Sequence, residues 1–160
     1  MHQHPTVHLP VYKEDGTSNS TEELEVEQLG ENHFRLIYSP GVVDGLAGGD
    51  EFALTKSDRL GYTIIKRSGN LCVWFYFSKQ GQNRGPAAAD VRAQVEQIGG
   101  WCDGGMNYLL VFTIPVSRGF HVIEPLFDSL VKQHPGSTWF YGNVYDPIDG
   151  QTPLRWWEPT

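Results

Sequence analysis

The sequence predicts an α+β protein in which a small N-terminal antiparallel β-barrel or curled sheet packs on a C-terminal ferredoxin-like βαββαβ sandwich. Three observations lead to this prediction. Short alternating segments separated by turn residues precede residue 70, two continuous apolar runs follow it, and two segments after residue 85 have helical periodicity. The 160 residues, 12% of them aromatic, suit one domain or two small ones that share a core.

Five short segments before residue 70 have the composition of strands: residues 7–12, 24–30, 34–39, 51–55 and 61–68. Within the second, Leu24 and Val26 alternate with glutamates, as in a strand with one buried face. Pro10 lies inside the first segment and therefore assigns it to a sheet edge. Such a series of short strands is typical of a small barrel or curled sheet.

The second half reads as strand, helix, strand, helix, strand. Helices are expected over residues 88–98 and 123–134 on one face of a sheet, and strands are expected over residues 71–77, 107–115 and 138–146, with a short extra strand over 100–106. The apolar run 71–77 has bulky residues at every position, so both of its faces should be covered. The face without helices needs a cover, which the barrel, a second subunit or a ligand would supply; the barrel is the simplest.

These patterns divide the chain into four segments. We expect a flexible N-terminal segment (1–20), a barrel-like subdomain (21–70), an α/β sandwich (71–146) and an irregular C-terminal tail (147–160). The chain has no apolar run long enough to cross a bilayer and no signal-peptide pattern at its start, so we expect a cytoplasmic protein. Its two cysteines are too few for a disulfide scaffold.

The run "YSPGVVDGLAGGDEFALT" (38–55) is the most motif-like stretch of the sequence. A phosphate-binding loop would lead into a helix and usually supplies a lysine, whereas this run leads into a strand and contains no lysine or arginine. Asp44 and Asp50 would repel a phosphate. We therefore expect a turn in which Asp50 binds nearby backbone N–H groups and at least one of Gly45, Gly48 and Gly49 has positive φ.

The net charge of −7 argues against nucleic acid or an anionic membrane as a partner, because both attract clustered Lys and Arg. Residues 13–31 contain seven acidic residues and one basic residue, Lys13. This segment is either a solvated face or an acidic patch that steers a basic protein partner. In the second case the candidate binding residues include Glu22, Glu23, Glu25 and Glu27.

Aromatic residues suggest a second interaction surface. The aromatic residues of the sandwich would line one face of its sheet, where they either pack in the core or bind a protein: Trp74, Tyr76, Trp139, Tyr141 and Tyr145. Trp156 and Trp157 are adjacent, so in an extended tail they point in opposite directions and one is difficult to bury. The tail is then pinned across the barrel, or it presents an exposed anchor. Trp139, Trp156 and Trp157 complete the candidate partner-binding residues.

No catalytic site, metal site or cofactor is expected. Cys102, Asp103 and His121 supply the residue types of a thiol catalyst, but no nucleophile signature surrounds them. The terminal His2, His4 and His8 would bind a metal only weakly. Cys72, inside an apolar strand, should be a buried thiol with a raised pKa that resists alkylation.

Three short motifs resemble a family of bacterial proteins known as domain of unknown function 4265, whose members carry "R-L-x-x-S-P", "G-L-A-x-G-D" and "S-G-N" in this order. The matching residues are Arg35, Leu36, Ser39, Pro40; Gly45, Leu46, Ala47, Gly49, Asp50; and Ser68, Gly69, Asn70. The resemblance is best over residues 24–77. It implies a small cytoplasmic bacterial protein and brings no activity, cofactor or catalytic residue. Some families of this kind serve as partners or immunity proteins for toxins.

The sequence therefore favours a non-enzymatic, acidic module that binds a basic protein, for example to neutralise a toxin. The alternative is a small-molecule-binding protein or an enzyme with a cleft between barrel and sandwich. A protein-binding module predicts a flat acidic or aromatic surface, whereas an enzyme predicts a deep pocket with convergent polar groups. The oligomeric state is left open.

Overall fold

The computed structural model describes residues 4–13, 15–56, 59–79, 84–106 and 108–159. These residues form an α+β fold with two antiparallel sheets, in the order β1 (Thr6–Val11), β2 (Ser20–Gly30), β3 (His33–Leu36), β4 (Glu51–Leu54), β5 (Tyr62–Lys66), β6 (Asn70–Tyr76), α1 (Arg84–Gln97), β7 (Trp101–Met106), β8 (Leu109–Pro115), the 3₁₀-helix η1 (Val116–Arg118), α2 (Phe120–Gln133) and β9 (Thr138–Tyr141). None of the described helices is long and apolar enough to cross a membrane.

The N-terminal sheet is a meander in which β1 to β5 pair in sequence order, each antiparallel to the next. It is open, so the barrel of the sequence prediction is not closed: β1 and β5 pair with one strand each in the described part of the chain. The two edges still approach each other at Gly61 and Pro10. A Cβ added to Gly61 would lie only 2.8 Å from Cδ of Pro10. Pro10 has no N–H to donate, which explains in part why no further ladder forms there.

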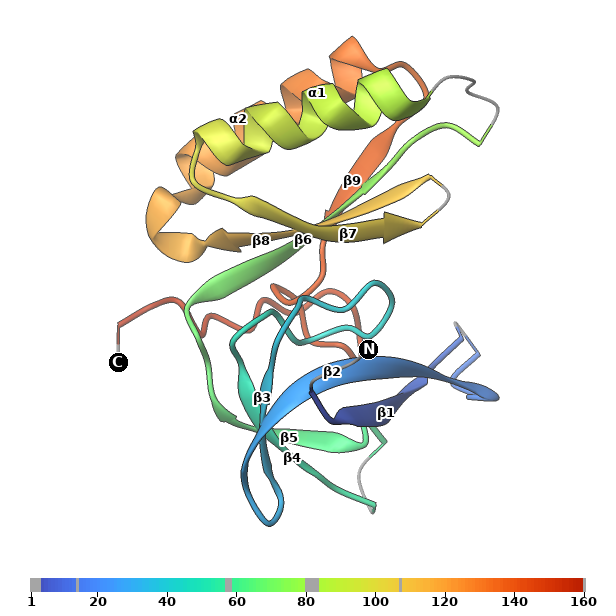
Figure 1. Ribbon diagram of the computed structural model, residues 1–160, viewed down its shortest axis with the longest axis vertical. Coiled ribbons are helices and arrows are strands. Elements are labelled where there is room, and N and C mark those ends of the chain that lie inside the picture. The colour runs from blue at the N-terminus through green and yellow to red at the C-terminus, as the bar shows by residue number, and fades with distance from the viewer. Residues whose placement is uncertain (1–3, 14, 57–58, 80–83, 107, 160) are drawn as a thin grey trace.

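The C-terminal sheet has the strand order β7-β8-β6-β9. Both α-helices cover the same face of it, as predicted (Figure 1), and their buried Val95 and Phe127 share one core with Phe75 of β6 and Phe112 of β8. Each helix begins earlier than its pattern suggested, at Arg84 and Phe120. The sequence prediction allowed Pro125 only in the first turn of a helix; it lies in the second turn of α2.

The opposite face of the C-terminal sheet is covered by the segment between β3 and β4, residues 37–50, which we call the junction loop. Ala47 of this loop packs on Cys72 and Trp74 of β6. Its Val43 and Leu46 are buried instead in the core of the N-terminal sheet. One loop therefore contributes to two cores, and its apolar residues help to fill the interior of the open sheet. This loop is the cover that the sequence left undecided.

The remaining segments connect these parts. Residues 6–11, within the segment expected to be flexible, form the edge strand β1. After β9 the chain is irregular, with one isolated bridge between Tyr145 and Pro153. In Figure 1 this C-terminal tail runs between the two sheets, beside the junction loop.

Candidate functional site

The junction loop is fixed from within by the buried carboxylate of Asp50. This carboxylate accepts hydrogen bonds of 2.9 Å from the backbone N–H groups of Ala47 and Ser68, and Arg67 lies 3.4 Å away. Burial raises the pKa of Asp50, while these donors and Arg67 act in the opposite direction. Gly45 and Gly49 have φ of 96° and 90°. Both expectations for this stretch, the aspartate-stabilised turn and the positive-φ glycine, are confirmed.

A second carboxylate holds the loop from outside. Glu22 of β2 accepts hydrogen bonds from the backbone N–H groups of Gly41, Val42 and Val43, at 2.8, 3.1 and 2.9 Å. The sequence suggested that Glu22 belongs to a binding patch, but its carboxylate is occupied by the loop. The sequence did contain a signal: Glu22 has the same strand parity as the buried Leu24 and Val26, so it points to the inner face.

The loop is also bonded to the C-terminal sheet. The carbonyl oxygen of Pro40 accepts a hydrogen bond of 2.7 Å from the indole N–H of Trp74. The Ser39 and Thr113 hydroxyls lie 2.5 Å apart, and Thr113 donates to Asp103. Burial raises the pKa of Asp103, while the Thr113 and Ser39 hydrogen bonds lower it. This network is internal, and it sets the position of the pockets next to it.

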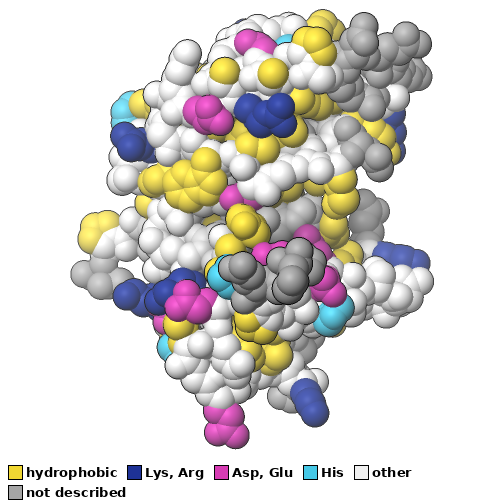
Figure 2. Space-filling model, viewed as in Figure 1, with side chains coloured by type: hydrophobic (Ala, Val, Ile, Leu, Met, Phe, Trp, Pro, Cys, Tyr) yellow, Lys and Arg dark blue, Asp and Glu magenta, His cyan; other side chains and the backbone are white. Residues whose placement is uncertain are grey.

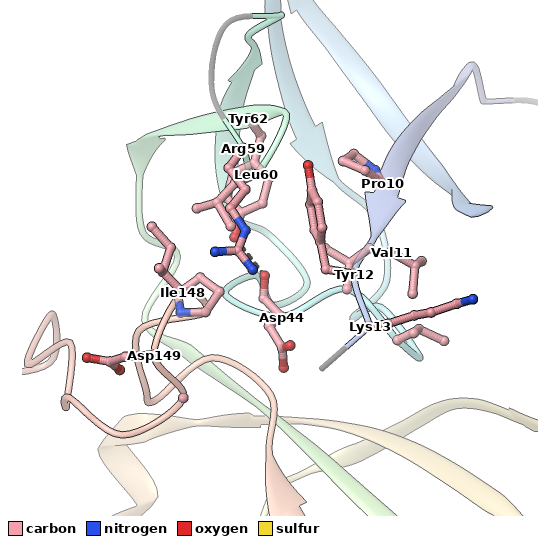
Figure 3. A pocket seen from close by; sticks show the side chains of 14 residues that line it. Pro10, Val11, Tyr12, Lys13, Asp44, Arg59, Leu60, Tyr62, Ile148 and Asp149 are labelled. Atoms are coloured by element: carbon pink, nitrogen blue, oxygen red, sulfur yellow. Dashed lines mark hydrogen bonds between the residues drawn. The ribbon is translucent and has the colours of Figure 1, made fainter. Parts of the chain in front are cut away.

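Two neighbouring pockets lie along the junction loop and the tail. The aromatic pocket, of about 400 Å³, is lined by Asp44, Trp74, Tyr76, Phe140, Tyr141, Gly142, Tyr145, Asp146, Pro147 and Gly150. The N-terminal pocket, of about 370 Å³ (Figure 3), is lined by Pro10, Val11, Tyr12, Lys13, Val42, Val43, Asp44, Arg59, Leu60, Tyr62, Pro147, Ile148, Asp149 and Gly150. Both volumes are in the range of small-ligand sites. Together they form the cleft, a feature expected of the small-molecule-binding alternative, in place of the flat surface expected of a protein-binding module.

Asp44 lines both pockets. In Figure 3 its carboxylate points away from Tyr62 and Leu60, toward the C-terminal sheet. The Tyr62 hydroxyl donates to the backbone oxygen of Asp44 at 2.7 Å, whereas the carboxylate has no hydrogen bond or ion pair with any other described residue. The residue is exposed to solvent, yet the protein around its carboxylate removes part of the surrounding water and raises its pKa to about 6. The site therefore contains a carboxylate that lacks a partner.

Neighbouring strands β6 and β9 supply the aromatic walls of the aromatic pocket. Trp74 of β6 lies opposite Phe140 of β9. The Tyr76 and Phe140 rings meet edge to face, with centroids 6.0 Å apart. Burial raises the pKa of the Tyr76 hydroxyl, and the charge of Asp44 raises it further. The sequence placed five aromatic residues on one face, and this was wrong: Trp139 and Tyr141 pack against the helices.

The other predicted acidic residues lie on the outer face of the N-terminal sheet, away from the cleft. Glu23 and Glu27 are exposed, and they lie 3.5 Å from His8 and 3.3 Å from Arg35. Glu25 on the same strand is partly buried. Figure 2 likewise shows acidic side chains next to histidine, lysine and arginine side chains on the face that it presents. Arg35 therefore offsets part of the negative charge of this strand.

The three predicted tryptophans are all partly buried. Trp139 stacks on Phe127 of α2, and its indole N–H donates to Asp128 at 3.0 Å. The indole N–H of Trp156 donates to the backbone oxygen of Asn143 at 2.8 Å. Trp157 packs on Phe120 with ring centroids 5.3 Å apart. The tail is thus pinned on both sides: its two tryptophans pack on the C-terminal half, whereas Pro147 and Ile148 line a pocket with residues of β1. Arg67, which follows β5, lies over the Trp156 ring at 5.7 Å.

The residues considered for catalysis or metal binding do not come together. No hydrogen bond joins Cys102 to His121 among the described residues, and partial burial raises the pKa of Cys102. Cys72 is fully buried, as predicted, and burial raises its pKa far above the usual value. Within the described ranges no three His, Cys, Asp or Glu side chains form a metal-binding group. His2 lies outside those ranges.

Comparison with known proteins identifies the family. The model for Domain of unknown function (DUF4265) matches residues 22–137. The chain belongs to this family. A crystal structure of a hypothetical protein from Neisseria gonorrhoeae is similar to this DUF4265 member, with a TM-score of 0.68 and 15% identity over 89% of this chain and 96% of that one. That likeness extends to the fold alone. A search of curated proteins finds no match.

Proposed function

We propose that the protein is a non-enzymatic binding protein that accepts a positively charged group of a basic protein partner in the cleft. The observation that carries this proposal is the position of Asp44, whose carboxylate lines both pockets and has no hydrogen-bond partner among the described residues. Asp44 is exposed, so water solvates its carboxylate in the free protein, and a bound cation would form the ion pair that this carboxylate lacks.

Two further observations support a basic ligand. The net charge of −7 attracts cations to the molecule over distances of about 10 Å, the Debye length at 0.1 M salt. The junction loop holds Asp44 between two cores, so the site is preformed and little ordering accompanies binding.

The experiment is affinity capture from a lysate with three baits: the wild type, Asp44→Asn, and Glu23→Gln. Each variant removes one negative charge, but Glu23 lies on the outer face of β2 and lines neither pocket. The proposal predicts a basic protein that the wild type and Glu23→Gln capture equally and that Asp44→Asn loses. If the captured proteins are the same for all three baits, the proposal is wrong.

The acidic strand remains the competing surface for such a partner. A triple variant with Gln at positions 23, 25 and 27 tests it, because these side chains do not take part in holding the junction loop. Under our proposal this variant slows association modestly and leaves the equilibrium affinity nearly unchanged. A large loss of affinity in the triple variant, with wild-type affinity in Asp44→Asn, would move the binding site to the strand.

We further propose that the C-terminal half is a ferredoxin-like βαββαβ sandwich. Support comes from the order of its elements along the chain, from the strand order β7-β8-β6-β9 and from the two helices on one face (Figure 1). Neutralisation of a basic toxin is one form that the proposed binding function would take, in line with the family resemblance noted above.

A further inference from the structure

Charged side chains are divided unevenly between the two pockets. Lys13 and Arg59 line the N-terminal pocket together with Asp44 and Asp149, and the Arg59 guanidinium lies over the Tyr12 ring at 5.2 Å. The charged residues that line the aromatic pocket are Asp44 and Asp146. A cation is therefore repelled in part by the first pocket and attracted by the second. An anion is disfavoured in the aromatic pocket.

Three aromatic rings of the aromatic pocket offer π-faces or edges to such a cation. The ring of Trp74 is fixed by its 2.7 Å hydrogen bond to Pro40, and Tyr76 and Phe140 stand edge to face beside it. A cation near an aromatic face is attracted by the ring quadrupole, most strongly where water is excluded. Aromatic walls around an unpartnered carboxylate are thus suited to a cation with an apolar stem.

The donor geometry favours a compact cation over a planar one. A guanidinium binds best where two carboxylate oxygens face it in one plane or where it stacks on one ring. In the aromatic pocket, one oxygen of Asp146 already accepts the backbone N–H of Ile148 at 2.8 Å. Asp44 is the carboxylate without a described partner, and the rings around it are not parallel. A small, nearly spherical ammonium contacts several such walls at once.

We propose that the aromatic pocket recognises an alkylammonium group, the side chain of a lysine in the partner protein. This inference rests on the proposed function and adds the identity of the recognised side chain. The four-carbon stem of lysine packs on the aromatic walls, and its ammonium donates to Asp44. The N-terminal pocket, which Lys13 and Arg59 line, would contact residues of the partner next to that lysine.

The proposal predicts a pH dependence that needs no variant. The groups that face Asp44 are the neutral Tyr76 and Cys72, the acids Asp146 and Asp149, and the cations Lys13 and Arg59. With the Asp44 pKa at about 6, about one molecule in eleven has this carboxylate ionised at pH 5 and nearly all do at pH 7.5. Lysine remains charged throughout, so affinity should fall roughly tenfold at pH 5.

The test uses three blocked amino acids with acetyl and methylamide ends: lysine, arginine and norleucine, with butylammonium as a free amine. Binding to the full chain is followed by the NMR shifts of the Trp74 indole N–H and the Gly142 amide, next to the pocket. We expect lysine to bind about tenfold more tightly than norleucine, and more tightly than arginine, with the excess lost in Asp44→Asn and at pH 5. Glu23→Gln should match the wild type.

Several results would overturn the inference. Equal binding of lysine and norleucine, or tighter binding of arginine, would each rule out recognition of an alkylammonium group. Binding of butylammonium without blocked lysine would assign the pocket to a free amine. The two proposals fail differently: an Asp44-dependent protein partner that blocked lysine does not displace refutes only this inference. Lysine binding without any Asp44-dependent partner refutes only the proposed function.

Discussion

The carboxylate of Glu22 accepts a hydrogen bond of 2.8 Å from the backbone N–H of Gly41. Together with its bonds to the next two amides, this contact ties β2 to the junction loop, 19 residues further along the chain. The loop in turn places Asp44 in the cleft. The structural support of the candidate site therefore begins on the strand that the sequence assigned to partner binding.

Replacing Glu22 by alanine should destabilise the protein. Three amide donors, two of them in partly buried hydrogen bonds, lose their acceptor, which we expect to cost about 2 kcal/mol of the free energy of unfolding. Urea denaturation measures this loss. The matched control is Glu23→Ala, one residue along the same strand and exposed, which should change stability by less than about 0.5 kcal/mol. Equal effects of the two substitutions on stability would contradict a structural role for Glu22.

Gly45→Ala should be more damaging than an alanine at another left-handed glycine. A Cβ at Gly45 meets the Tyr62 hydroxyl, whereas one at Gly69, with a similar φ of 88°, meets no atom within 4 Å. We expect a cost of about 1 kcal/mol at Gly69, from backbone strain, and about 3 kcal/mol at Gly45. Thermal or urea unfolding of both variants compares them.

The collision at Gly45 can be separated from the strain. In a Tyr62→Phe background the hydroxyl is gone, and the nearest remaining ring carbon, Cζ, lies 3.5 Å from the Cβ position. Gly45→Ala should therefore cost less in that background than in the wild type. An undiminished cost would mean that the hydroxyl contributes nothing, and that backbone strain and the Pro147 Cγ, 3.2 Å from the Cβ position, explain the effect.

Cys72 should react with a maleimide only after unfolding. Its side chain is fully buried beneath the junction loop and its pKa is raised by burial, whereas Cys102 is half-exposed. Mass spectrometry of protein labelled under native conditions should find the label on Cys102 before Cys72. Rapid native labelling of Cys72 would show that the loop opens and uncovers this face of the sheet.

The raised pKa of Asp44 should make the cleft carboxylate destabilising at neutral pH. A carboxyl whose pKa is about 6 in the folded protein and 3.8 when unfolded binds protons preferentially in the folded state. Its contribution to stability then falls as pH rises from about 4 to 6. Asp44→Asn should be more stable than the wild type at pH 7 and lose this advantage at pH 4.

The size of that advantage is limited by solvent. Because Asp44 is accessible from the cleft, we expect about 1 kcal/mol or less. Urea unfolding of Asp44→Asn and the wild type at the two pH values gives the difference, with Glu23→Gln as the surface-charge control. An identical stability difference at pH 4 and pH 7 would contradict the raised pKa.

Local patterns were sufficient to predict most of the fold. Alternation placed Leu24 and Val26 in the core, helical spacing found the buried Val95 and Phe127, and the glycine cluster indicated positive φ at Gly45. The sequence did not decide between a barrel and a curled sheet, because closure depends on how Pro10 and Gly61 meet across the edges. No local pattern encodes that approach.

The candidate site was predicted only in outline, as a cleft between the two halves. The walls of the site depend on strand register. Trp139 is paired with Phe75, and Phe140 is paired with Trp74. Because neighbouring residues of a strand point to opposite faces, this register places the aromatic residues on two faces of the sheet. A shift of one residue would exchange them. The position of Asp44 depends on the path of a loop between two cores. Its neighbours in space are distant in sequence, so no motif surrounds it.

The central claim is that Asp44 receives the positive charge of the ligand, and an NMR pH titration of its side-chain carboxyl tests this most directly. We predict a pKa of about 6 for the free protein, and a pKa lower by about one unit when blocked lysine or the captured partner is bound at saturation. A pKa near the ordinary value of 3.8 in the free protein, or one that the ligand leaves unchanged, would contradict the account.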